Sequence, residues 1–327
     1  MTSRRLLLMA TVVALQGVGR SSRAQPDAKP RRVGVLAPST AAREAVTLEP
    51  FFDEMRKLGW IEGRNIVYER AFGDDRPGGL AQAAAALVAG KPELIYAPPS
   101  PAAVAAQRAT RTIPIVFGTG TDPVGTGLVA SLARPGGNVT GVVSVIDSLA
   151  PKLVELLLAV LPAARRIGLL DDPADPRSLL DRRVLGPLAA ARGLALVPVP
   201  TRGADDFDAA VSLLLAQRVD AIVTSSALVF NLRARLLQAA AAAKVPVVGH
   251  RSQLVDDGAL LSYGASLAAQ LRRSAHLVDK VLKGGNPAEI PVEQPTVFEL
   301  VVNLKTARSL GFVIPQAVLL SADRVID

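Results

Sequence analysis

Small and polar residues stand directly after several short apolar runs of this sequence, where they could bind a small molecule. Hydroxyl groups and free backbone amides suit a carboxylate or another anion, an aspartate suits an ammonium group, and an arginine suits a carboxylate. In the first half of the chain these residues are Ser39, Thr40, Pro99, Ser100, Thr119, Gly120 and Asp122, and in the second half they are Asp171, Asp172, Ser225, Ser226, His250 and Arg251.

The sequence lacks the common motifs of catalysis. It contains no G-x-S-x-G, no G-x-x-x-x-G-K-[ST] and no H-E-x-x-H. The glycines over 118–127 have the wrong spacing for a dinucleotide-binding loop. There is no cysteine, and His250 and His276 are the only histidines. We therefore expect a protein that is not an enzyme and that holds neither a metal nor a cofactor.

The elements that must position these residues alternate along the chain. Strands are expected at 32–36, 65–71, 94–97, 113–117, 138–144, 166–170, 194–199, 221–224, 247–249, 259–261 and 298–302. Helices are expected at 45–58, 80–89, 101–110, 125–132, 150–160, 179–191, 207–216, 228–243, 267–282 and 305–310. This alternation predicts an α/β fold with parallel sheets and crossover helices on both faces.

The alternation begins a second time in the middle of the chain. The run RIGLL at 166–170 has the pattern of RVGVL at 32–36. Two α/β lobes in tandem are therefore predicted. Because parallel strands end at one edge of their sheet, the polar segments of each lobe gather at that edge, and facing edges would line one cleft. A helix N-cap role is the alternative for each Ser, Thr or Asp, so only their joint placement indicates a site.

The first 24 residues have the features of an export signal. Arg4 and Arg5 precede an apolar run over 6–15, and small residues at Ser22 and Ala24 suit a cleavage site. The run is too short to span a bilayer, so we expect cleavage after Ala24 and a mature protein without membrane insertion. The general secretory and twin-arginine routes both remain open.

The charge of the chain is modest once this segment is removed. The formal net charge of +8 falls to +4, because residues 1–24 hold four arginines and no acid. Acids and bases are dispersed, so nucleic-acid binding is not indicated.

Three segments resemble a known family. They are IPIVFGTGTDPVGTGLVASLARPGGNVTG at 113–141, GWIEGRNIVYE at 59–69, and the C-terminal quarter with PVEQPT at 291–296. Together they make the chain similar to the TrpX-like substrate-binding proteins of bacterial ABC transporters, which have the type I periplasmic-binding fold. The resemblance runs from about residue 32 to residue 327, nearly the whole mature chain.

The resemblance implies two Rossmann-like lobes that are joined by crossover hinge strands and close on a ligand. On this basis we expect a signal peptide at 1–24, a linker at 25–31, lobe 1 at 32–143 and 264–290, and lobe 2 at 144–263 and 291–327. It places cleft positions near Ser39, Ser100, Thr119, Asp122 and Tyr263. Two departures from the family are Pro98-Pro99-Ser100-Pro101 after the third strand and Ser226 where an aspartate is frequent, so tryptophan or tyrosine is not carried over as the ligand.

These expectations combine into one leading hypothesis. The chain is a periplasmic solute receptor that captures a small molecule, such as an amino acid or another carboxylate or aromatic compound, and delivers it to an inner-membrane ABC permease with a cytoplasmic ATPase. We expect a monomer that diffuses freely, since no cysteine is present for lipid attachment. The alternatives are a periplasmic ligand-sensing subunit of a signalling receptor and, as a third reading, an α/β enzyme.

Overall fold

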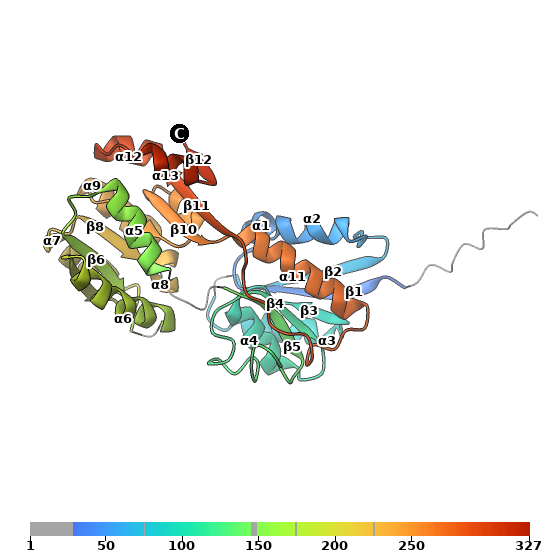
Figure 1. Cartoon of the computed structure of the whole chain (residues 1–327). Coiled ribbons are helices and arrows are strands. Elements are labelled where there is room, and N and C mark those ends of the chain that lie inside the picture. Colours follow the sequence, from blue (N-terminus) through green and yellow to red (C-terminus); the bar gives the residue numbers. More distant parts are fainter. Residues whose placement is uncertain (1–28, 75, 145–148, 174, 225) are drawn as a thin grey trace, which may run out of the picture.

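The computed structural model describes residues 29–74, 76–144, 149–173, 175–224 and 226–327. The expected signal peptide and most of the expected linker lie outside these residues. The chain forms two lobes, each built on its own sheet (Figure 1). The prediction of two α/β lobes with largely parallel sheets is confirmed.

Lobe 1 contains a five-stranded parallel sheet of order β2-β1-β3-β4-β5. The strands are β1 (Arg31–Ala37), β2 (Ile66–Phe72), β3 (Leu94–Tyr96), β4 (Ile115–Gly120) and β5 (Val139–Val143). The residues of β3, β4 and β5 are almost all buried, as expected of strands that are covered on both faces, whereas the edge strand β2 is only partly buried.

Two layers of helix cover the lobe 1 sheet. The N-terminal helices are α1 (Ala41–Thr47), α2 (Glu49–Lys57), α3 (Gly79–Ala89) and α4 (Ser100–Ala109). On one face α3 and α4 pack alanines and leucines against Ile95, Ile115 and Phe117. On the other face α2 packs together with α11 (Leu267–Leu282), a helix from the last quarter of the chain.

Lobe 2 contains a seven-stranded sheet of order β12-β11-β10-β9-β8-β6-β7. The strands are β6 (Arg166–Asp171), β7 (Ala195–Pro200), β8 (Ala221–Thr224), β9 (Val247–Gly249), β10 (Leu261–Ala265), β11 (Phe298–Asn303) and β12 (Arg324–Ile326). All pairs are parallel except that of β10 with β11. β11 is antiparallel to β10 because the chain leaves lobe 2 after β10 and returns from the same side into β11.

Helices also cover both faces of the lobe 2 sheet. One face carries α5 (Ala150–Val160), α6 (Pro176–Ala191), α12 (Leu304–Leu310) and α13 (Gln316–Ser321). The other face carries α7 (Phe207–Ala216), α8 (Ala227–Asn231), α9 (Arg233–Ala242) and α10 (Ser252–Asp256). Among the described residues, no helix combines the length and hydropathy needed to cross a membrane.

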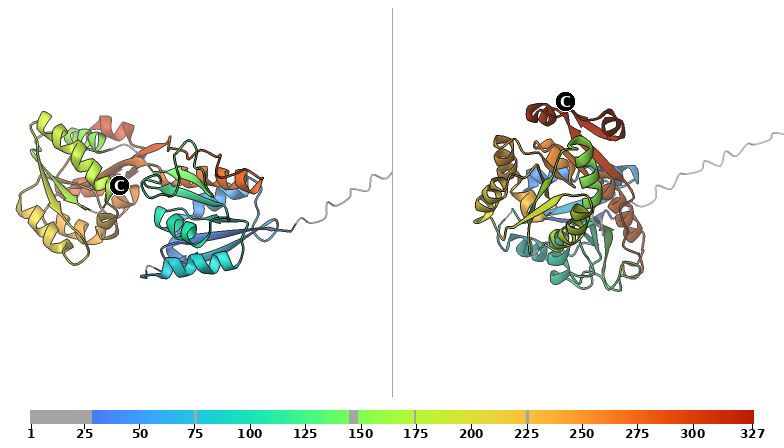
Figure 2. Two further views of the ribbon diagram at one scale, coloured as in Figure 1. Left: turned by 90° about the horizontal axis from the view of Figure 1, so that it is seen from below. Right: turned by 60° about the vertical axis from the view of Figure 1, so that its left-hand side comes forward.

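Three segments of chain connect the lobes, and the first of them contains residues 145–148, which lie outside the described residues (Figures 1 and 2). The first follows β5, the second joins β10 to α11, and the third precedes β11. The third runs beside β5, where Glu293 accepts a hydrogen bond from Val143 N (2.8 Å) and donates one to Gly141 O (2.9 Å). The second and third are joined where Ser266 N donates to Val297 O (3.0 Å).

Several predicted elements are wrong in detail. The helix predicted at 125–132 is a series of turns, because Gly125 and Gly127 favour turns and Asp122 and Gly127 adopt left-handed backbone conformations (φ 44° and 72°). The helix predicted at 45–58 is two helices that meet at Leu48, one residue before Glu49-Pro50 opens α2. The helix predicted at 228–243 is likewise two helices that meet at Leu232. The strand predicted at 259–261 begins only at Leu261.

Gly141 provides a test of how tightly β4 and β5 are packed. A Cβ atom at this position would overlap the carbonyl oxygen and ring of Phe117, which is fully buried. We expect Gly141→Ala to lower the free energy of unfolding by about 2 kcal/mol. Urea denaturation followed by circular dichroism measures this value.

Gly137→Ala is the matched control, because no atom lies within 4 Å of a Cβ built there. We expect a change within about 0.5 kcal/mol. Equal effects of the two substitutions would contradict the proposed close packing.

Candidate functional site

The carboxyl ends of β1, β3 and β4 bring most of the predicted lobe 1 residues to one edge. Pro99 forms an isolated parallel bridge with Thr119, so the segments after β3 and within β4 run side by side. The Ser100 hydroxyl accepts a hydrogen bond from Thr121 N (2.7 Å) and donates one to Thr121 O (3.2 Å). Gly120, the last residue of β4, lies between these contacts. These four predicted residues therefore form one braced loop pair.

Ser39 and Thr40 follow β1 but differ in their surroundings. Ser39 is 6% exposed, and its buried Oγ has no hydrogen-bond partner among the described residues. Thr40 is exposed and is the N-cap residue of α1, although its side chain makes no capping bond. Buried hydroxyls are normally paired, so a further partner is expected for Ser39, as it is for the buried hydroxyl of Tyr68 in the same lobe. The Thr119 hydroxyl donates to Pro98 O (3.3 Å) and is half-buried.

The Asp122 carboxylate contacts its own loop. Asp122 is exposed, and its Oδ1 accepts a hydrogen bond from Gly125 N (2.8 Å). Its carbonyl accepts from Thr126 N (3.0 Å) and from the Thr126 hydroxyl (2.9 Å). These bonds stabilise the turn that replaces the predicted helix, so this residue has a structural role whether or not it also meets a ligand.

Of the two lobe 2 acids predicted at the cleft, Asp171 already has an ion-pair partner in the protein. Asp171 ends β6 and is 1% exposed. Its carboxylate accepts from Arg182 Nη1 (2.7 Å) and from the Ser178 hydroxyl (3.1 Å). A buried carboxylate with both partners gains little from a ligand ammonium group. Ser225, also predicted, lies outside the described residues.

The remaining predicted residues of lobe 2 follow β8 and β9 or lie in β10. Ser226 is the N-cap of α8, and its hydroxyl accepts a hydrogen bond from Val229 N (3.1 Å). This residue therefore caps a helix, which is the alternative to a role in ligand binding. Arg251 is the exposed N-cap residue of α10, and its guanidinium lies over the Phe230 ring, 4.4 Å from the centroid. Tyr263 is half-buried and stacks on Phe298, with ring centroids 6.0 Å apart.

Two buried hydroxyls at this edge were missed by the sequence analysis. Thr224 pairs with Gly249, and Gly249 pairs with Ser262, so the three residues form one row across β8, β9 and β10. Thr224 Oγ1 and Ser262 Oγ have no hydrogen-bond partner among the described residues. Thr224 is the last residue of the strand predicted at 221–224, so its position at the carboxyl end of a strand could have identified it as a candidate site residue. Ser262 lies beyond the strand predicted at 259–261, and the misplaced strand hid it.

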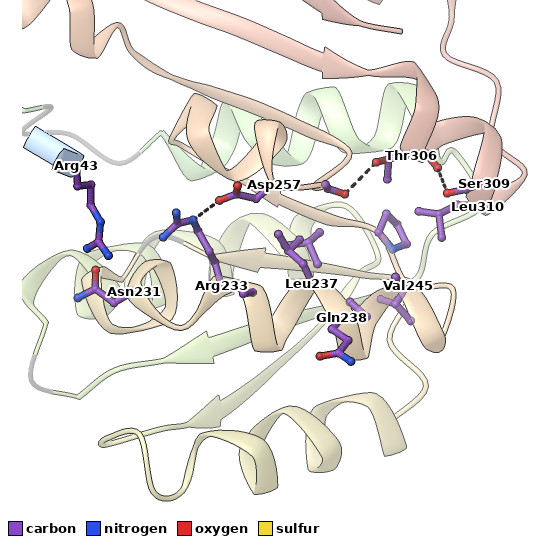
Figure 3. Close-up of a pocket in the computed structure, with 16 residues that line it drawn as sticks. Arg43, Asn231, Arg233, Leu237, Gln238, Val245, Asp257, Thr306, Ser309 and Leu310 are labelled. Atoms are coloured by element: carbon purple, nitrogen blue, oxygen red, sulfur yellow. Dashed lines mark hydrogen bonds and ion pairs between the residues drawn. The ribbon is translucent and has the colours of Figure 1, made fainter. Parts of the chain in front are cut away.

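A cavity of about 750 Å³ lies elsewhere on lobe 2 (Figure 3). Its lining comes mostly from α9 and α12, with Asn231 at one end beside Arg43, which reaches it from α1 of lobe 1. None of the predicted site residues lines this cavity. In the described part of the chain, no cluster of three His, Asp or Glu residues is placed to hold a metal ion.

Comparisons with known proteins agree with this architecture. Residues 35–326 match a family model described as ABC transporter substrate binding protein. The tyrosine-binding protein of Clostridioides difficile (strain R20291) is 27% identical over 260 residues, which are 80% of this chain and 75% of the relative.

Two solved structures match nearly the whole chain. An ABC domain from Streptococcus pneumoniae in complex with L-Trp has a TM-score of 0.81 and 26% identity, covering 91% of this chain and 100% of that one. A conserved domain protein from Vibrio cholerae has a TM-score of 0.80 and 30% identity, with the same coverage. The fold is that of the type I periplasmic-binding proteins.

Two predicted N-cap residues with hydroxyl groups, Thr40 of lobe 1 and Ser226 of lobe 2, allow a direct test of which hydroxyl is structural. Ser226→Ala removes the bond to Val229 N, so we expect the free energy of unfolding to fall by about 1 kcal/mol. Thr40→Ala removes no capping bond and should cost less than about 0.5 kcal/mol. Chemical denaturation of both variants measures the two changes in the free energy of unfolding. Equal decreases would contradict a stabilising cap hydrogen bond from Ser226 that Thr40 lacks.

Proposed function

The chain belongs to the ABC transporter substrate-binding protein family, and from this premise we propose that it is the periplasmic solute receptor of an import system. In this proposal a small molecule binds between the lobes, and the closed protein delivers it to an inner-membrane permease that is driven by a cytoplasmic ATPase. Binding takes place without turnover, and the receptor acts as a monomer.

The observation that carries the proposal is the orientation of the two sheets. β5 of lobe 1 and β10 of lobe 2 both lead from their carboxyl ends into the connections between the lobes. The carboxyl edges of both sheets therefore lie on the side of the connections, where the lobes meet. Loops at the carboxyl edge of a parallel sheet are the usual ligand site of open α/β folds.

The groups at these edges favour a ligand with an acidic and an aromatic or apolar part. Lobe 1 offers the Ser39 hydroxyl and the braced loops that contain Ser100 and Thr119. Lobe 2 offers the guanidinium of Arg251 and the ring of Tyr263. The bound L-Trp of one similar structure and the name of the tyrosine-binding relative support an amino acid or a related aromatic carboxylate.

Three connections between the lobes suit a hinge. Only a ligand that binds the closed form more tightly than the open form can shift that equilibrium. The third connection is hydrogen-bonded to β5 at Glu293. Residues 294–297 follow this contact and lead directly into β11. We expect rotation of the lobes to be taken up there and in the connection between β10 and α11.

A ligand screen by thermal denaturation tests the proposed receptor. We expect L-tyrosine, L-tryptophan, benzoate or 3,4-dihydroxybenzoate to raise the melting temperature. A ligand at 100 times its dissociation constant adds about 2.7 kcal/mol to the free energy of unfolding. The protein should release the ligand chemically unchanged, which mass spectrometry of the eluted compound measures.

Substitution of the lobe 1 hydroxyls tests the location of the site. We expect Ser39→Ala combined with Thr119→Ala to weaken binding of the best probe about 10-fold or more, since two hydrogen bonds to a charged group are lost. Thr112→Ala, an exposed change before the amino end of β4, is the control and should leave affinity unchanged. Unchanged affinity in the double variant would place the site elsewhere.

Small-angle X-ray scattering tests the hinge. Saturation with the best probe should reduce the radius of gyration, because the lobes rotate toward each other around the bound molecule. An identical scattering curve with and without saturating ligand would contradict closure. The same measurement on the control variant Thr112→Ala should show the compaction of the unsubstituted protein.

A further inference from the structure

We propose that Gln270 is a positioning residue that stabilises the closed form of the receptor by holding the end of β10 next to the end of β5. The inference rests on the proposed function and adds to it a residue that couples rotation of the lobes to affinity. In this role Gln270 acts through Ala265 and Ser144, and no contact with the ligand is needed.

Gln270 is a buried polar side chain that joins the two lobes. It lies near the start of α11 and is 5% exposed. Its Nε2 donates to Ala265 O, at the end of β10 (3.4 Å), and its Oε1 accepts from the Ser144 hydroxyl, directly after β5 (3.5 Å). Because α11 packs on the lobe 1 sheet and β10 belongs to the lobe 2 sheet, this carboxamide spans the boundary between them.

The backbone that carries Gln270 is fixed to lobe 1. Leu271 and Ala275 of α11 are buried in the core of that lobe. One turn after Gln270, Arg273 forms an ion pair with Glu293, whose backbone is hydrogen-bonded to β5. When lobe 2 rotates, the carboxamide therefore stays with lobe 1, and its distance to Ala265 O must change.

Both contacts of the carboxamide are longer than a typical hydrogen bond. Donor–acceptor distances in proteins are about 2.9 Å for N–H donors and about 2.7 Å for hydroxyl donors. The distances of 3.4 and 3.5 Å at Gln270 can therefore gain stability by becoming shorter. A rotation that lengthens them would leave a buried carboxamide without a partner, which costs free energy.

The position of the carboxamide indicates which rotation shortens its contacts. Ser144 N donates to Gly120 O (2.6 Å), so Gln270 lies beside the end of β4 and the ligand loops of lobe 1. Closure of the proposed receptor brings lobe 2 toward lobe 1 on that side. Shorter contacts at Gln270 then favour the closed form, and every ligand that binds this form gains affinity by the same factor.

Gln270→Leu tests the role of the carboxamide. The substitution keeps a side chain of similar size but removes both hydrogen-bonding groups. We expect the dissociation constants of L-tryptophan and benzoate to rise by the same factor, about fivefold, in isothermal titration calorimetry. The midpoint of urea denaturation should not fall, because an apolar side chain replaces a buried amide that is poorly paired. Substitution of a residue that touches the ligand would affect the two probes unequally.

Gln270→Glu is the decisive variant, because its effect depends on pH. Burial raises the pKa of the introduced carboxyl above its ordinary value. At about pH 5.5 the protonated carboxyl can donate to Ala265 O as the amide does, whereas at about pH 8 the carboxylate has acceptors only. Relative to the intact protein at the same pH, we expect the dissociation constant to agree within about twofold at the lower pH and to be raised about fivefold or more at the higher pH.

Gln107→Glu is the matched control. The Gln107 amide likewise donates to a backbone carbonyl, that of Leu128 (2.8 Å), and is half-buried. Both residues belong to lobe 1, so this bond does not change when the lobes rotate. The substitution introduces the same group and the same charge, and affinity relative to the intact protein should be equal at both pH values. A pH dependence equal to that of Gln270→Glu would show a general effect of the added charge and overturn the inference.

The outcomes separate the inference from the proposed function. If neither probe binds the intact protein, the proposed receptor for such ligands fails, and the inference fails with it. If a probe binds and Gln270→Leu has equal or greater affinity for it than the intact protein, the receptor stands and the role of Gln270 is wrong. That role is also wrong if Gln270→Glu is weakened by the same factor at both pH values.

Discussion

The pairing of Glu293 with β5 is the constraint on which the two-lobed architecture depends. Two backbone hydrogen bonds join Glu293 to Gly141 and Val143, and the Glu293 side chain forms an ion pair with Arg273 of α11 (2.7 Å for the Nη2 contact). The returning chain is therefore held to lobe 1 until it passes Glu293. Because α11 has already packed on the lobe 1 sheet, this pairing is what brings the last quarter of the chain back toward lobe 2 at the edge where β5 ends.

That edge also determines what the loops can do. Gly120 O accepts from Ser144 N (2.6 Å), so the end of β4 is held beside the first connection. Gln270 near the start of α11 has its Nε2 3.4 Å from Ala265 O and its Oε1 3.5 Å from the Ser144 hydroxyl, which brings it close to two of the connections. Rotation of the lobes must therefore disturb contacts that lie next to the ligand loops. In the proposed receptor, the ligand loops and the connections between the lobes adjoin one another, so that occupancy would be coupled to conformation there.

Regular elements were predictable where periodicity was strong and local. The helices at 207–216 and 267–282 and the strand at 221–224 have the bounds expected from their apolar spacing. The helix expected at 125–132 failed because its apolar spacing was outweighed by glycines and by the hydrogen bonds of Asp122. Which hydroxyl is a cap could not be predicted, since Ser226 and Thr40 have the same local sequence character and differ only in the geometry of the folded loop.

The polar groups of the site divide into those satisfied by the protein and those that still need a partner. The sequence shows only that they follow strands, and the structure shows that Asp171 and Asp122 are engaged by Arg182 and by Gly125 N. Ser39 Oγ, Thr224 Oγ1 and Ser262 Oγ are buried without a partner in the described part of the chain. A buried hydroxyl without a partner costs free energy, and a ligand or water that pairs with it recovers that cost. The unsatisfied groups are hydroxyls rather than carboxylates, so each can donate a hydrogen bond to a ligand acceptor or accept one from a ligand donor. The acids that sequence reasoning chose for an ammonium group, Asp122 and Asp171, are instead engaged by groups of the segments that follow β4 and β6.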